Sequence, residues 1–210
     1  MAEKEIDDPK HDDTSPVDDF MLKEYESIAS AHFDSQAGLR QQFRFYLVIA
    51  AVPVTLIGLA FKDRPAHEIE QLTFFNLPVV LTSVFFAIGI LGILLLLSMI
   101  HTALDATMYA RTVNGVRQYF VQRAGGLGSD IKPYLLMPFD KTRPKYFHIR
   151  SFFWQVTLIA AVNTFYITLV IHRLLHNGCL YGLLCAVLFL GQIGMYRLFT
   201  HQREQKEISE

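Results

Sequence analysis

The feature that most constrains this chain is an uncharged stretch from Gln71 to Leu104, which lies between Glu70 and Asp105. A helix that crosses a membrane needs about 20 consecutive, mainly apolar residues, and this stretch exceeds that length. No strong helix breaker separates it from the polar, helix-competent segment that follows and ends near Gly125. We therefore predict one long helix that crosses a membrane and continues into solvent.

Three further stretches have the length and apolar character of a membrane span. Hydrophobic residues make up 51% of the chain, and the mean hydropathy of +0.26 is high for a soluble protein of 210 residues. The sequence predicts an all-α integral membrane protein with four transmembrane helices in two antiparallel hairpins, and with cytosolic extensions of the first two helices. The predicted segments are a disordered acidic tail at 1–14, a cytosolic or juxtamembrane helix at 15–42, spans at 43–61, 72–100, 150–172 and 178–197, a cytosolic helical extension at 101–124, a basic membrane-surface loop at 125–148, and a cytosolic tail at 198–210.

The distribution of basic residues predicts the orientation. Most of them lie between the second and third spans, whereas the opposite side carries only Lys62, Arg64 and Arg173. Because cytoplasmic loops carry the excess of lysine and arginine, the middle segment and both termini should be cytoplasmic. We expect a multi-pass protein of the cell (inner) membrane.

The sequence lacks the motifs of several enzyme classes. It has no Walker A phosphate-binding motif, no GxSxG serine motif and no HExxH zinc motif. Its two cysteines, Cys179 and Cys185, lie in one apolar run, so they predict neither a disulfide framework nor a four-ligand zinc site. We expect a protein without a cofactor and without enzymatic activity.

One stripe of the long helix ends in an ionisable pair. At helical spacing, the stripe consists of Ser83, Ala87, Ile90, Leu94, Ser98, His101 and Asp105. The last two lie one turn apart where the helix should leave the hydrocarbon, and ionisable groups at that depth usually face protein or water. They predict a coupling or gating point, or instead an interfacial salt bridge to an arginine of a neighbouring segment: Arg40, Arg44 or Arg150.

A second group of candidates lies on the cytosolic extension of the same helix. Arg111, Asn114 and Gln118 share one face, and Arg117 lies beside it. Guanidinium groups next to an amide are suited to an anionic ligand or to a protein partner. The alternative is a basic helix that pairs with anionic lipid headgroups and with the acidic first helix.

A basic cluster precedes the third span. It consists of Lys141, Arg143, Lys145 and Arg150, and anionic lipid headgroups are the partner that explains it most simply. Arg143 and His148 also have the arginine-to-histidine spacing of some helical ribonucleases, although Pro144 is poorly placed inside a helix. Nucleic acid is therefore not an expected partner.

Three histidines are weak candidates for a metal site on the outer side. His172 and His176 lie one turn apart, and His67 follows the first span. Imidazoles bind zinc or copper, but the pattern lacks thiolate or carboxylate ligands at fitting spacing. Histidines at an interface are more often simply polar helix ends, so we predict no metal.

Small and polar residues mark the expected contacts between spans. Thr157, Ala161, Thr164 and Thr168 form a stripe in the third span, and Gly178, Gly182 and Ala186 recur in the fourth. We interpret the stripes, together with Ser83 and Ala87, as packing faces. Two amides, Asn163 and Gln192, need partners at membrane depth, and they could join helices in one subunit, join subunits, or line a pore.

These patterns favour a homo-oligomeric membrane sensor or effector. By architecture alone, this shape fits a pore or membrane-perturbing effector, as in bacterial defence systems. Its cytosolic helical lobe would bind a partner or an anionic ligand and alter the spans. One alternative is a small ion channel or transporter subunit, which would need His101, Asp105, Asn163 or Gln192 to face water. Another is a membrane-anchored enzyme acting on lipid or nucleic acid, which would need Arg143 and His148, or His101 and Asp105, for chemistry.

Overall fold

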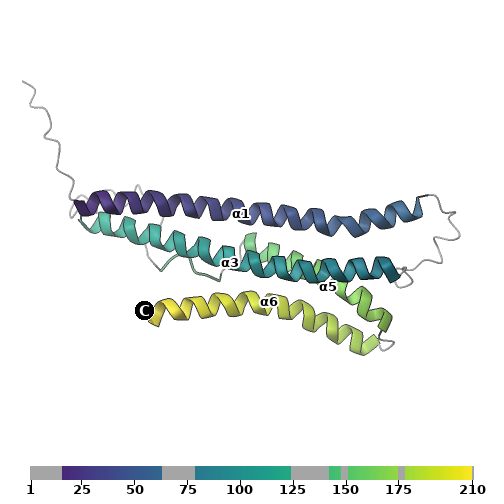
Figure 1. Cartoon of the computed structure of the whole chain (residues 1–210). Helices are drawn as coiled ribbons and strands as arrows, with labels where there is room; N and C mark the ends of the chain where they lie inside the picture. The colour runs from purple at the N-terminus through teal and green to yellow at the C-terminus, as the bar shows by residue number, and fades with distance from the viewer. Residues whose placement is uncertain (1–15, 63–78, 124–141, 148–150, 175–177, 210) are drawn as a thin grey trace, which may run out of the picture.

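The computed structural model describes residues 16–62, 79–123, 142–147, 151–174 and 178–209. These ranges contain four helices and no strand: α1 (Pro16–Phe61), α3 (Val79–Arg123), α5 (Ser151–Leu174) and α6 (Gly178–Ser209) (Figure 1). Each helix contains a window that is long and apolar enough to cross a membrane. The predicted all-helical class and the number of candidate spans agree with this structure.

Helices α1 and α3 run side by side in opposite directions along most of their lengths (Figure 1). Asp18, in the first turns of α1, lies 2.9 Å from the guanidinium of Arg123 at the end of α3. Further along, the His32 ring nitrogen lies 2.9 Å from the backbone oxygen of Ala106. Pro16 and the acidic first turn suit a helix start, because proline has no amide hydrogen to lose there and carboxylates favour the N-terminal dipole.

Helix α3 is the centre of the bundle, since it contacts α1, α5 and α6. Its inner face is fully buried at Phe85, Leu96, Met99 and Ile100. The stripe that begins with Ser83 and Ala87 lies on the exposed side of the helix, so the prediction that these two residues pack against neighbouring helices is wrong within one chain. Because α3 is apolar on all sides in this region, periodicity does not distinguish its inner from its outer face.

The glycines that allow close helix packing are in the second span rather than the fourth. A Cβ atom added at Gly89 would lie 2.7 Å from Ile167 Cγ1 on α5, and Gly92 is more crowded still. Gly178 and Gly182 face open space, and Ala186 is exposed. The prediction that this α6 stripe is a packing face therefore does not hold within one chain, because its side of α6 lies away from the bundle.

The charged C-terminus, which was predicted as a cytosolic tail, is helical in this structure. Helix α6 continues through it to Ser209, so residues 198–209 are helical. At this end α6 lies beside α3 and beside residues 142–147, a short loop segment before α5. We refer to residues 16–44, 101–123, 142–147 and 197–209 together as the charged end of the bundle (Figure 1).

Candidate functional site

Two buried amides and a tyrosine form a polar node between the candidate spans. Asn163 Oδ1 accepts a hydrogen bond from the Tyr46 hydroxyl at 3.0 Å, and Asn163 Nδ2 donates to Gln192 Oε1 at 3.0 Å. Gln192 Nε2 lies within 3.4 Å of further acceptors: the carbonyls of Ala160 and Leu188 and the hydroxyl of Thr164. Both amides thus find partners inside one chain, which is the first of the three arrangements that the sequence left open.

Gly92 makes room for this node. A Cβ atom at this position would lie 1.9 Å from Asn163 Oδ1 and 2.7 Å from Asn163 Cγ. The missing side chain is therefore what lets α3 approach α5 at the level of the amide. Four helices meet here, since Tyr46 belongs to α1 and Gln192 to α6.

At the charged end, a buried arginine of α3 contacts both the end of α6 and the loop segment 142–147. Arg111 Nη1 lies 2.5 Å from Glu207 Oε2, and Nη2 lies 3.4 Å from Glu204 Oε1, both on α6. Arg111 Nε donates to the backbone oxygen of Pro144 at 2.8 Å, and the guanidinium carbon lies 4.2 Å from the centroid of the Tyr146 ring. We call these five residues the arginine latch.

Tyr146 completes the latch from the loop segment. Its hydroxyl donates a hydrogen bond to Glu207 Oε1, and the residue is only 2% exposed. Burial, followed by the hydrogen bond to Glu207 and the charge of that carboxylate, raises the pKa of Tyr146 to about 12. The tyrosine is therefore neutral at ordinary pH and acts as a donor to the carboxylate.

The residues predicted to bind a ligand are engaged in contacts within the chain. Asn114 is buried and donates to the backbone oxygen of Arg143 at 2.9 Å, so it holds the same loop segment as Arg111. Arg117 donates to the Tyr25 hydroxyl on α1 at 3.0 Å. Gln118 is partly buried. In this structure the arginine and amide donors of the lobe join α3 to its neighbours.

His101 and Asp105 are both exposed on the outer stripe of α3. The His101 ring lies 5.3 Å from the Phe199 ring, measured between centroids. Among the described residues, neither His101 nor Asp105 forms a salt bridge with Arg40 or Arg44; Arg150 lies outside those residues.

The remaining candidates fall partly outside the described ranges. Of the possible metal ligands, His172 packs its ring 5.0 Å from the Tyr181 ring, whereas His67 and His176 lie outside. No group of three histidine, cysteine or carboxylate side chains that could hold a metal occurs within the ranges the structure describes. Arg143 and Lys145 of the basic cluster are exposed, and Lys141, His148 and Arg150 are not described.

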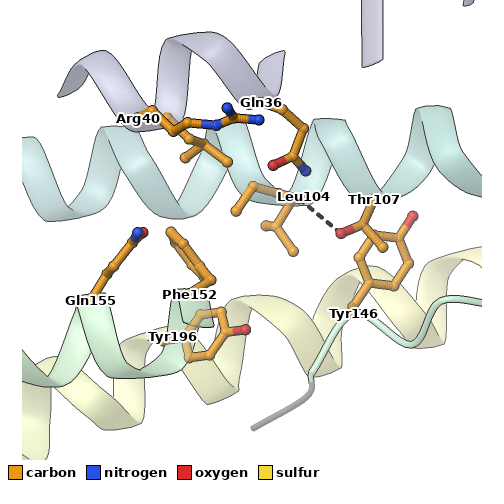
Figure 2. A pocket seen from close by; sticks show the side chains of 10 residues that line it. Gln36, Arg40, Leu104, Thr107, Tyr146, Phe152, Gln155 and Tyr196 are labelled. Carbon is orange, nitrogen blue, oxygen red and sulfur yellow. Dashed lines mark hydrogen bonds between the residues drawn. The ribbon is translucent and has the colours of Figure 1, made fainter. Parts of the chain in front are cut away.

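A cavity of about 380 Å³ opens beside the latch (Figure 2). Gln36 and Arg40 approach it from α1, Thr107 from α3, and Phe152 and Gln155 from α5. Tyr146 of the latch is also part of its wall. A cavity of this size is comparable with small-molecule sites, which occupy about 300–1,000 Å³.

Several of these residues were not singled out from the sequence. Glu204 and Glu207 lie in a segment interpreted as a tail, although their spacing of three residues is one that places two carboxylates on the same face of a helix. Tyr46 and Tyr146 gave no signal beyond an aromatic residue near a predicted interface. Their partners are more than 60 positions away, at Asn163 for Tyr46 and at Glu207 for Tyr146.

The chain matches no protein family, no curated protein sequence and no solved structure.

Proposed function

We propose that this protein is a non-enzymatic, multi-pass membrane sensor or effector of the cell (inner) membrane, in which a cytosolic lobe responds to a partner or ligand and alters the spans. The four apolar helices support the membrane location. Helices α1, α3 and α6 extend unbroken from their apolar parts into the charged end. A change at that end can therefore reach the membrane through continuous helices.

The charged end is the cytosolic side in this proposal. The excess of basic residues between α3 and α5 supports this orientation, with both termini in the cytoplasm. The spans then form two antiparallel hairpins, α1 with α3 and α5 with α6. Support for the second pairing comes from the rings of Phe152 and Tyr196, which lie 5.4 Å apart at one end, and of His172 and Tyr181, which lie 5.0 Å apart at the other.

The arginine latch is the observation that carries the proposal. Arg111 is 9% exposed, yet its partners come from a loop segment and from the end of α6, which α3 contacts much less extensively than it contacts α1 and α5. The side chains of Glu204 and Glu207 are 36% and 33% exposed, but that of Arg111 is only 10% exposed, so loss of the carboxylates would leave a largely buried positive charge without compensation, which is unfavourable. In this proposal the latch has two states: closed, as in this structure, with Arg111 paired, and open, with Arg111 hydrated. A ligand or partner that favours one state would move α6 relative to α3.

A homo-oligomer fits the surface of the spans. The small residues Gly178, Gly182 and Ala186 form an exposed stripe on α6, and such stripes let helices approach closely in lipid. A second copy of the chain on this stripe would connect the latch of one subunit to the spans of another. In such an assembly, opening of the latch would change the permeability of the membrane.

A small ion channel subunit is the second candidate, and the outer stripe of α3 favours it. Ser83, Ser98, His101 and Asp105 are exposed on this stripe. If several copies placed it around a common axis, these polar groups would line a path with His101 and Asp105 at the cytosolic end. Such a channel would conduct with the latch intact.

Leakage from reconstituted vesicles tests the proposal. The full chain would be placed in vesicles of phosphatidylethanolamine and phosphatidylglycerol that contain a fluorescent dye and a potassium-sensitive probe. Arg111→Met should increase leakage several-fold over the original chain because it opens the latch. Arg123→Met is the matched control: this arginine also joins α3 to another helix, through Asp18, but its side chain is 48% exposed, and it should leave leakage unchanged.

The double variant Arg111→Glu with Glu207→Arg exchanges the two charges and should partly restore the closed state, and with it the low leakage. This result would show that the ion pair, and not the arginine as such, keeps the latch closed. The proposal is wrong if Arg111→Met inserts and folds like the original chain, by protease protection and circular dichroism, yet leaks no more. If the original chain conducts potassium ions as well as Arg111→Met does, the ion channel subunit becomes the favoured function.

A further inference from the structure

The cavity beside the latch lies where the apolar part of each helix ends. On α1, Arg40 and Arg44 precede the apolar run that starts at Phe45. On α3 the run ends at His101, and on α6 it ends at Arg197. The cavity is lined by residues from these levels, so in a bilayer it would lie at the depth of the lipid headgroups.

The walls of the cavity combine hydrogen-bond donors with apolar surface. Arg40 supplies a guanidinium, and Gln36 and Gln155 supply amides (Figure 2). Leu104 and Phe152 supply apolar surface (Figure 2). None of the described residues that line the cavity is acidic.

Arg40 is the only cationic side chain among the described lining residues, and it forms no salt bridge within the part of the chain that the structure describes. A guanidinium presents a planar fork of donors that matches phosphate oxygens, and charge-assisted hydrogen bonds of this type are stronger than neutral ones. An anion with several oxygen acceptors therefore fits the chemistry of this wall.

We propose that the cavity binds the phosphate group of an anionic membrane lipid, with Arg40 as its principal contact and with the first part of an acyl chain against Leu104 and Phe152. A free phosphate ester from the cytosol shares the same headgroup chemistry. The apolar wall and the depth of the cavity favour the lipid, because a free phosphate ester makes no use of either.

The cavity is connected to the arginine latch through Tyr146. This side chain is part of the cavity wall, and its hydroxyl donates to Glu207 of the latch. A bound lipid would thus contact the residue that orients the Glu207 carboxylate. This consequence rests on the proposed function, whereas the binding of the lipid does not.

Binding would be measured by native mass spectrometry on the full chain, purified in detergent and stripped of lipid. The probes are dioleoyl phosphatidylglycerol, dioleoyl phosphatidylcholine and glycerol 3-phosphate. The original chain should bind one phosphatidylglycerol per subunit more tightly than phosphatidylcholine, and should bind glycerol 3-phosphate at least tenfold more weakly because it lacks acyl chains. Arg40→Gln should weaken the binding of phosphatidylglycerol about tenfold or more.

Arg44→Gln is the matched control. Arg44 lies one helical turn from Arg40 and is exposed, as Arg40 is, but it does not line the cavity. Its loss should change the binding of phosphatidylglycerol by less than about twofold. A third variant, Ala103→Phe, retains both arginines and fills the cavity, and should weaken binding as much as Arg40→Gln.

Equal losses for Arg40→Gln and Arg44→Gln would overturn the inference, because they would indicate general attraction to a charged surface. Unchanged binding by Ala103→Phe would overturn it as well. Binding of glycerol 3-phosphate as tightly as the lipid would reject the lipid as the occupant.

The two proposals fail separately. Arg40-dependent binding of phosphatidylglycerol with no leakage from Arg111→Met would retain the lipid site and reject the latch as a control element. Leakage from Arg111→Met with no Arg40-dependent binding would retain the proposed function and reject the lipid site.

Discussion

The substitution Gly92→Ala should destabilise the bundle, although alanine favours the helix more than glycine does. The added Cβ would lie 1.9 Å from Asn163 Oδ1, 2.7 Å from Cγ and 3.0 Å from Nδ2. Either the amide rotates or α3 moves away from α5. Rotation of the amide breaks its hydrogen bonds to Tyr46 and Gln192, each 3.0 Å long.

The magnitude follows from these contacts. Two interhelical hydrogen bonds in a membrane protein contribute about 1.2 kcal/mol together, at an average of about 0.6 kcal/mol each. The Tyr46 hydroxyl keeps a second acceptor, the backbone oxygen of Ile159 at 3.3 Å, but the buried Gln192 Oε1 left without its donor adds about 1–3 kcal/mol. Alanine regains about 1 kcal/mol over glycine inside a helix. The net loss of unfolding free energy for Gly92→Ala is therefore about 2 kcal/mol.

Unfolding in mixed micelles with increasing sodium dodecyl sulfate, followed by circular dichroism, measures this loss. Gly58→Ala is the control, because Gly58 is also in an apolar part of a helix but nothing lies within 4 Å of an added Cβ. The control should be neutral or slightly stabilising, so the two alanine substitutions should differ in sign. In an Asn163→Ala background the cost of Gly92→Ala should disappear, because the colliding atoms are gone. A Gly92→Ala variant as stable as Gly58→Ala, or an equal cost in both backgrounds, would refute the reasoning.

Two further predictions concern tyrosines. Tyr46→Phe removes the donor to Asn163 Oδ1 and should lower the unfolding free energy by about 1–2 kcal/mol in the same assay. The control is Tyr181→Phe, which should have no effect because the Tyr181 hydroxyl has no hydrogen bond among the described residues. Equal effects of the two substitutions would contradict the stabilising role of the polar node. Because folding raises the pKa of Tyr146 from 10.0 to about 12, the stabilisation from its neutral hydroxyl is complete below about pH 10 and is lost as pH rises toward 12. Protease cleavage within residues 198–209 of the original chain should therefore increase between about pH 10 and pH 12. The Tyr146→Phe variant should show no such increase. An equal increase in the variant would mean that a group other than Tyr146 titrates.

The identities of many candidate residues were accessible from the sequence, but their partners were not. Asn163 and Gln192 are conspicuous as amides within apolar runs, and both belong to the polar node. Arg111 and Asn114 were expected to share a face, and both donate to residues 143–144. In this structure their donors contact the loop segment and the end of α6, and the binding of a ligand or partner at these residues stays a prediction.

The length of the apolar runs alone determined that this chain forms long helices with four candidate spans. A run of about 20 apolar residues suits a membrane-spanning helix, because in lipid a helix satisfies all its backbone hydrogen bonds within the segment. Tertiary structure alone decided which side of α3 is inside, because that helix is apolar on all sides in its membrane part and its inner face is set by packing against α1 and α5, including the close approach of Gly89 and Gly92 to α5. It also decided that Glu204 and Glu207 close the latch on Arg111, because pairs this far apart in sequence meet only when whole helices pack.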